Sequence, residues 1–325
     1  MRIVTRVYRA NVLESIHTGE AAVVDGTGKL LFHTDQPDGH IFARSTLKPF
    51  QALPLLSSGA ADSYHLTNEE LAVICGSHNG EPVHVQTVRN LLKRTGLSEE
   101  QLLCGTHKPL DETAADTALA GGIELTPVYN NCSGKHTGML LAAKQQRIPL
   151  ENYVQAEHPL QQQIKHLVSE LTGRSDFHTG IDGCSLPTYY LTLREIAMLF
   201  QKLGEPGDTH FARIFNAMNG CPYLVAGQRR FDTAIMEACP GTIVSKIGAE
   251  GVRGLTVRYG NASYGIAVKA HDGAWRATAP MMLTILESLG WITADVLSAL
   301  SDHHRPVRKN HRGLKVGHIA AEILE

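Results

Sequence analysis

The segment RSTLK, residues 44–48, contains the only Ser-x-x-Lys in the chain. On a helix, positions i and i+3 share a face, so the amine of Lys48 would lie beside the hydroxyl of Ser45. A desolvated lysine near another cation can lose its proton near neutral pH and serve as the general base for a serine nucleophile. Arg44 and Lys246 are candidates for that cation. The alternative is the start of a surface helix, because this pattern also arises by chance.

A second serine stands in the loop sequence CGSHNG, residues 75–80, which follows an apolar run and precedes Pro82. Small residues between two helices expose a hydroxyl and backbone N–H groups to a ligand. Ser77 is therefore a candidate nucleophile or proton relay. The alternative is a tight helix–helix turn with a buried Cys75.

Two cysteine-containing segments bring together possible metal ligands. In NNCSGKHTG, residues 130–138, Cys132, Lys135 and His136 have the i, i+3 and i, i+4 spacings that would place them at one site on a helix. In GIDGCSLP, residues 180–187, Asp182 and Cys184 point the same way if the segment is extended. Two cysteines with His or Asp form a zinc site by ligand type, although no CxxC pair supports it. The alternative is a set of buried thiols.

The segment SKIGAEG, residues 245–251, follows a run of β-branched residues. Lys246 would polarise a hydroxyl there, and Glu250 would bind an amino group of a substrate. The alternative is a charged strand terminus.

The elements that must position these residues follow from hydrophobic periodicity. Alternation over residues 3–34 and β-branched runs over 242–270 predict strands. A capping box at Thr67–Glu70 begins a series of helices, and residues 314–324 fit either a strand or a helix. We therefore expect an α/β fold in which an antiparallel sheet joins both chain ends. It would be a single compact unit over residues 1–325, with a mainly helical lobe at residues 45–175.

Composition excludes several classes of protein. Thirty Lys and Arg against 32 Asp and Glu give a formal net charge of −2, which leaves no basic excess for binding nucleic acid. The N-terminal segment lacks the apolar core of a signal peptide, and no run reaches the roughly 20 apolar residues of a membrane span. Six scattered cysteines indicate reduced thiols. We expect a cytoplasmic protein that binds neither nucleic acid nor membrane.

Six blocks taken in order resemble the rhizobial-type L-asparaginases, also called class 3 or asparaginase II. They are RSTLKPFQ, CGSHNGE, NNCSGKHTGML, GIDGCSLPTY, RRFDTAIME and SKIGAEG, between Arg44 and Gly251. The resemblance implies a fold similar to serine β-lactamases and glutaminases. It also implies hydrolysis of L-asparagine to L-aspartate and ammonia, and a homodimer.

The resemblance further implies roles for individual residues. Two Ser-Lys pairs fall on Ser45 with Lys48 and on Ser77 with Lys246. A zinc ion would be held by the ligands Cys132, Lys135 and Cys184, with Asp182 close by. The residues expected to face the substrate are Arg44, Asp182, Glu250 and His136. Arg44 would bind the carboxylate of the substrate. His136 is no longer expected to be a zinc ligand, and it would instead lie next to the ligands or face the substrate.

The resulting hypothesis is acyl transfer with Ser45 as the nucleophile and Ser77 as the alternative. Backbone N–H groups near Ser45 or in the Gly76-Ser77 loop would stabilise the oxyanion. Zinc would position the substrate and brace the loops, because two thiolates and an amine make it a poor Lewis acid. Two other functions stay open: a glutaminase or other serine amidase, and a zinc-dependent amino-acid-binding protein without turnover.

Overall fold

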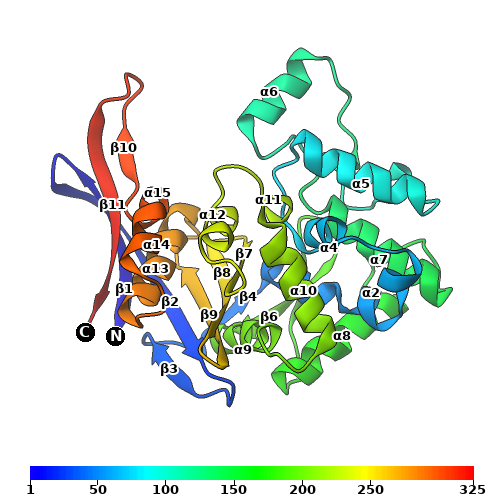
Figure 1. Ribbon diagram of the computed structural model, residues 1–325, viewed down its shortest axis with the longest axis horizontal. Helices are drawn as coiled ribbons and strands as arrows, with labels where there is room; N and C mark the ends of the chain where they lie inside the picture. The colour runs from blue at the N-terminus through cyan, green and yellow to red at the C-terminus, as the bar shows by residue number, and fades with distance from the viewer. The chain divides into compact units, whose positions relative to one another are not determined.

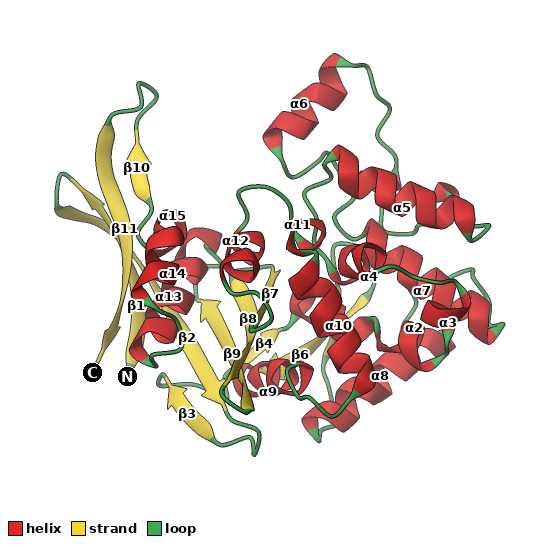
Figure 2. Cartoon of the chain, viewed as in Figure 1, coloured by secondary structure: helices red, strands yellow, loops and turns green.

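The computed structural model describes residues 1–325, which divide into two compact units. Unit 1 contains Met1–Thr46, Leu191–Glu205 and Ala234–Glu325, and unit 2 contains Leu47–Tyr190 and Pro206–Thr233. Figure 1 labels their elements in chain order, and Figure 2 separates helices from strands. The mainly helical lobe expected at residues 45–175 falls almost wholly within unit 2.

Unit 1 is built on an antiparallel eight-stranded sheet in the order β10-β11-β1-β2-β9-β8-β7, with β3 paired to β2. Both chain ends contribute to it as the alternation predicted, because Arg2 of β1 lies opposite Leu324 of β11. The segment that fitted either a strand or a helix is therefore a strand. The strands of this unit are β1 (Arg2–Arg9), β2 (Val12–Val24), β3 (Leu30–His33), β4 (His40–Phe42), β7 (Ile243–Gly248), β8 (Val252–Tyr259), β9 (Ala262–Ala270), β10 (Val307–Lys309) and β11 (Lys315–Leu324).

Helices cover both faces of this sheet, and glycines allow the close approach. Gly19 on β2 faces α13 (Trp275–Ser288), since a Cβ there would lie 2.9 Å from the sulfur of Met281. Gly265 is opposite Val24 of β2, on the other face. A Cβ at Gly265 would lie 1.8 Å from the carbonyl oxygen of Ala197 in α9 (Leu193–Leu203). The sheet is thus the middle of three layers. Unit 1 also contains the short helices α14 (Ala294–Ala299) and α15 (Ser301–His304).

Unit 2 is mainly helical. Its first long helix, α4 (Asn68–Cys75), begins at the predicted capping box: the Thr67 side chain accepts from the Glu70 N–H, and the Glu70 carboxylate accepts from the Thr67 N–H. The other helices are α1 (Lys48–Gln51), α2 (Leu53–Ser57), α3 (Ala60–Ser63), α5 (Pro82–Arg94), α6 (Glu112–Ala120), α7 (Ser133–Gln146), α8 (Pro159–Thr172), α10 (Thr209–Gly220) and α11 (Pro222–Val225), and α12 (Phe231–Ala238) continues into unit 1. None of the helices in either unit combines the length and apolarity that a membrane span requires.

Helices α4 and α7 pack unusually closely in unit 2. A Cβ at Gly134 would lie 2.3 Å from the carbonyl oxygen of Val73, and one at Gly138 would lie 2.6 Å from a side-chain carbon of Ile74. The two glycines are four positions apart, so they share one face of α7. This approach brings the loop that follows α4 to the first turn of α7.

Candidate active site

Lys48 lies fully buried at the start of α1, with its amine on the hydroxyl of Ser77. The distance between Lys48 Nζ and Ser77 Oγ is 2.8 Å. The same nitrogen donates to the carbonyl oxygens of Gly76, at 2.6 Å, and Asn131, at 3.0 Å. One amine therefore joins the loop after α4 to the segment before α7.

These contacts satisfy Lys48 in either protonation state. A carbonyl oxygen can only accept, so two N–H groups of Lys48 are assigned to Gly76 and Asn131. A hydroxyl can donate or accept, so Ser77 can receive the third N–H of an ammonium or donate to the lone pair of a neutral amine. Burial lowers the pKa of Lys48, against an opposing effect of Cys132. The arrangement is suited to moving a proton between serine and lysine.

A second cluster contains two thiols and another buried amine. Lys135 Nζ lies 3.0 Å from Cys184 Sγ. A hydrogen bond from the Cys184 thiol lowers the pKa of Cys132 well below its usual value, and the same bond with burial raises the pKa of Cys184. Burial acts to lower the pKa of Lys135, but the charge of Cys132, followed by those of Cys184 and Asp182, outweighs it and raises that pKa overall.

The chemistry of this donor set fits zinc. Thiolates and a neutral amine are ligands that zinc accepts, and the Lys135–Cys184 contact shows that side chains from two segments already meet. No group of three or more His, Cys, Asp and Glu side chains in the chain is arranged to hold a metal. A metal at this position would therefore depend on Lys135 losing its proton.

The loop carrying Ser77 is fixed by backbone hydrogen bonds. Ser77 N–H donates to Val225 O, and Asn79 N–H to Ala226 O, both at 2.8 Å. Gly76 N–H donates to Val73 O at 3.2 Å. The N–H groups of Gly76 and Ser77 thus already have acceptors within unit 2, and oxyanion donors near Ser45 or in this loop stay a prediction.

His136 does not share the partner of Lys135, although helical spacing placed both at one site. Its ring is fully buried, and Nδ1 lies 2.6 Å from the hydroxyl of Tyr153. That hydroxyl also accepts the N–H of Leu103 at 3.0 Å. The other ring nitrogen, Nε2, is buried without a hydrogen-bond partner. A substrate-facing role for His136 stays a prediction.

Four predicted site residues belong to unit 1. Arg44 and Ser45 lie in the 3₁₀ turn Arg44–Leu47, where Arg44 has the left-handed φ of 51°. Lys246 is fully buried on β7 and donates to Ile247 O at 2.7 Å. Glu250 is exposed in the turn after β7. Their partnership with Lys48, Ser77 and the substrate stays a prediction.

Asp182 stands in the turn before Cys184, half-buried, and its carboxylate accepts the Gly183 N–H at 2.7 Å. Its charge acts on both thiols and on Lys135, which agrees with its expected place beside them. Sequence reasoning missed the carbonyl of Asn131 and the side chains of His78 and Ser133. Their position inside the CGSHNG and NNCSGKHTG blocks was the available signal.

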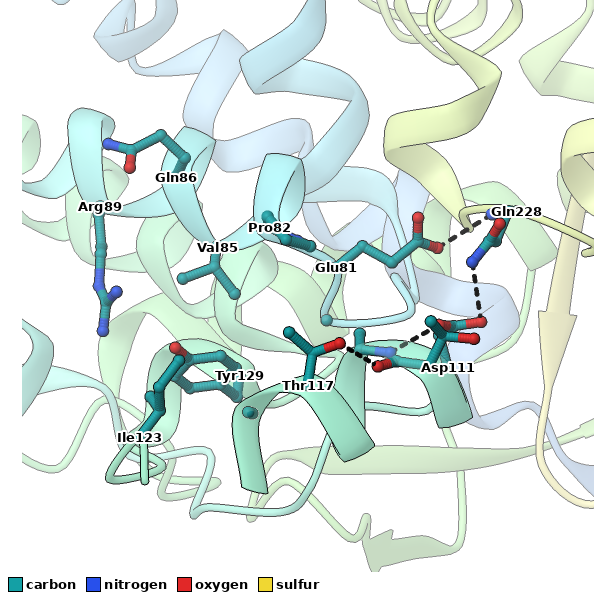
Figure 3. Close-up of a pocket in the computed structure, with 14 residues that line it drawn as sticks. Glu81, Pro82, Val85, Gln86, Arg89, Asp111, Thr117, Ile123, Tyr129 and Gln228 are labelled. Atoms are coloured by element: carbon teal, nitrogen blue, oxygen red, sulfur yellow. Dashed lines mark hydrogen bonds between the residues drawn. The ribbon is translucent and has the colours of Figure 1, made fainter. Parts of the chain in front are cut away.

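A pocket of about 370 Å³ is lined by residues of α5 and α6. Figure 3 draws the residues that line it. At one end, the Gln228 backbone N–H donates to Glu81 at 3.0 Å, and the Gln228 side chain donates to Asp111 at 3.2 Å. At the other end, the guanidinium of Arg89 lies 5.5 Å from the ring centroid of Tyr129. Glu81 ends the loop that contains Ser77, so this pocket and the serine share one loop.

Residues 5–321 match the family model described as L-asparaginase II. One similar solved structure is a protein from Bacteroides dorei DSM 17855 provisionally described as a beta-lactamase; it is 13% identical, with a TM-score of 0.42 over 78% of this chain and 85% of that chain. No curated protein matches the sequence.

Proposed function

The chain belongs to the L-asparaginase II family, and we propose that it hydrolyses L-asparagine to L-aspartate and ammonia through a serine acyl-enzyme. The family supports an amidohydrolase. The observation that carries the mechanism is the 2.8 Å contact between the buried amine of Lys48 and the hydroxyl of Ser77. A protein that only binds amino acids has no need of a serine held on a lysine.

In the first step, Ser77 Oγ attacks the side-chain amide carbon of asparagine while its proton moves to neutral Lys48. The lowered pKa of Lys48 favours the neutral amine that this step requires. The carbonyls of Gly76 and Asn131 keep the amine in place throughout. The resulting tetrahedral intermediate collapses when its C–N bond breaks, the nitrogen takes the proton from Lys48, and ammonia leaves.

In the second step, water hydrolyses the ester on Ser77. Lys48, neutral again, accepts a proton from water as the hydroxyl oxygen bonds to the ester carbon. The bond from that carbon to Ser77 Oγ then breaks, and Lys48 returns the proton to the serine. Aspartate is released, and the enzyme regains its starting state.

Ser77 thus replaces Ser45 as the preferred nucleophile, because the described contact of Lys48 is with Ser77. Ser45 and Lys246 remain candidates for the same reaction. Arg44 remains a candidate for binding the carboxylate of the substrate, and Glu250 for binding its ammonium. His136 and Asp182, which belong to unit 2, are further candidates for contacting the substrate.

Zinc would be held by Cys132, Lys135 and Cys184. When bound, it would supply a fixed positive charge that positions the substrate. Cys184→Ser should lower the zinc content measured by metal analysis and raise KM more than it lowers kcat. An inactive variant with unchanged zinc content would contradict the positioning role.

The decisive experiment measures ammonia release from L-asparagine and from L-glutamine with the wild type, Ser77→Ala and Ser45→Ala. We expect release from asparagine, a loss of at least about 10³-fold in Ser77→Ala and a smaller loss in Ser45→Ala. The reverse order of losses would make Ser45 the nucleophile. Release only from glutamine, or none from a folded wild type, would overturn the asparaginase proposal.

A further inference from the structure

His78, the residue after Ser77, joins the Ser77 loop to the first residue of α7. Its ring is fully buried. Nδ1 lies 3.1 Å from the backbone nitrogen of Gly80, and Nε2 lies 2.9 Å from the hydroxyl oxygen of Ser133. Because a backbone N–H can only donate, Nδ1 is the acceptor. In the neutral ring the proton is therefore on Nε2, which donates to Ser133.

The surroundings hold the ring in this orientation. The imidazole of His84 stacks on that of His78, with centroids 5.0 Å apart and an interplanar angle of 11°. His84 in turn stacks on Tyr223 at 5.7 Å. The ring of His78 is thus packed and hydrogen-bonded at both nitrogens.

The two segments that His78 joins are the same two that Lys48 joins. Lys48 connects Gly76 and Ser77 to Asn131, and His78 connects Gly80 to Ser133. The two bridges therefore define where the hydroxyl of Ser77 lies relative to the amine of Lys48. A misplacement of about 1 Å in such a pair can cost about 10²-fold in rate.

We propose that His78 is a positioning residue, which holds the Ser77 hydroxyl on Lys48 by tying the loop to Ser133. The inference rests on the proposed function in so far as Ser77 is the reacting serine. It does not depend on asparagine being the substrate. It assigns His78 no contact with the substrate and no proton transfer to it.

Three substitutions separate the two hydrogen bonds of the ring. In His78→Gln, the side-chain amide can reproduce the Nε2–H donor to Ser133. In His78→Asn, the shorter side chain can keep the acceptor for Gly80 but does not reach Ser133. His78→Leu removes both bonds while filling much of the volume.

The measurement is kcat and KM with asparagine, together with the acylation burst from p-nitrophenyl acetate. We expect about a 10- to 100-fold fall in kcat and burst rate for His78→Asn and His78→Leu, with KM unchanged. His78→Gln should retain most of the rate. Equal rates in all three variants and the wild type would overturn the proposal, as would equal losses in all three.

Ser133→Ala provides a second route to the same test, without altering the histidine. It should reproduce the loss of His78→Asn, and the double variant should be no slower than either single one. Losses that multiply would mean that the two residues act independently, and would overturn the proposal. Unfolding curves and zinc content matching the wild type exclude a general structural effect.

The burst also separates the failure of this inference from failure of the proposed function. If asparagine is not hydrolysed but the burst depends on Ser77 and falls in His78→Asn, the positioning role stands and the substrate is another amide or ester. If Ser77→Ala leaves the burst unchanged, Ser77 is not the reacting serine, and the role of His78 is overturned with it.

Discussion

Lys48 and Lys135 are two buried lysines of the same unit with opposite electrostatics. Lys48 is 0% exposed and Lys135 is 3% exposed, so both lose nearly all hydration. The pKa of Lys48 is lowered by this burial, whereas that of Lys135 is raised despite it. Burial outweighs the opposing effect of Cys132 at Lys48, whose described hydrogen-bond partners are neutral oxygens, whereas the charge of Cys132 outweighs burial at Lys135.

The difference shows that burial alone does not decide the state of a lysine. Where desolvation outweighs the nearby negative charge, the free amine is favoured, which suits a general base. Where the negative charge outweighs desolvation, the ammonium is favoured until something else replaces its proton. In the proposed function, Lys48 would therefore transfer a proton, and Lys135 would exchange its proton for a metal ion.

The strongest test of this contrast removes the base. Lys48→Met should lower kcat by about 10³- to 10⁴-fold, because the proton of Ser77 then has no acceptor. Ammonia release from asparagine measures it. Lys144→Met is the matched control, since Lys144 also donates to a carbonyl, Thr95 O at 2.6 Å, and should keep turnover near the wild-type rate. Comparable losses in both variants would remove the special role of Lys48.

Replacing Lys135 should mainly lower the zinc content and not the rate of turnover. Lys135→Met deletes a proposed zinc ligand, so the zinc content after dialysis should fall below about a tenth of the wild-type value. Turnover should fall less than in Lys48→Met. Lys135→Arg keeps the charge but has no lone pair to offer, and should lose zinc equally. Full zinc occupancy in either variant would mean that Lys135 is not a zinc ligand.

The contacts of Lys48 depend on the close approach of α4 and α7. Gly134→Ala should lower the free energy of unfolding by about 1–3 kcal/mol, because its Cβ would overlap the carbonyl oxygen of Val73. Urea unfolding measures the change. Gly183→Ala is a control, since a Cβ there meets nothing within 4 Å. An unchanged free energy of unfolding in Gly134→Ala would mean that α4 and α7 can move apart without destabilising the protein.

Burial also shifts the titration of two histidines in unit 2. Burial lowers the pKa of His78 and of His84, and His78 also faces the positive or titratable groups His84, Lys48, His107 and Arg230. Below about pH 6.5 the unfolded chain binds protons that these folded rings do not, so stability should fall as pH falls, by at most about 1.4 kcal/mol per pH unit for each ring. Urea unfolding between pH 5 and 7.5 tests this. A steeper slope in His78→Asn than in the wild type would contradict it.

Local patterns predicted much of the fold. The capping box at Thr67, the strands at both chain ends and the loop around Ser77 are properties of neighbouring residues, and all are present. The form of the segment at residues 314–324 was left open because its strand character comes from pairing with β1. Periodicity describes one segment at a time, so it could not supply that partner.

The contacts within the candidate site could not be predicted from spacing. Spacing paired Lys48 with the serine three positions earlier, whereas its described contact is Ser77, 29 positions later. That contact depends on where two helices meet, which no single segment specifies. The same limit explains why His136 was placed beside Lys135, although its ring contacts Tyr153.

The pairing of β1 with β11 also has a consequence for the order of folding. Strand β11 lies between β10 and β1, so the sheet of unit 1 stays incomplete until the residues near 320 have been synthesised. Unit 2, in contrast, contains no residue beyond Thr233, so it can begin to fold earlier on the ribosome. The serine loop would then be assembled before the sheet closes, and a truncated chain lacking β11 would expose the edge of β1 to aggregation.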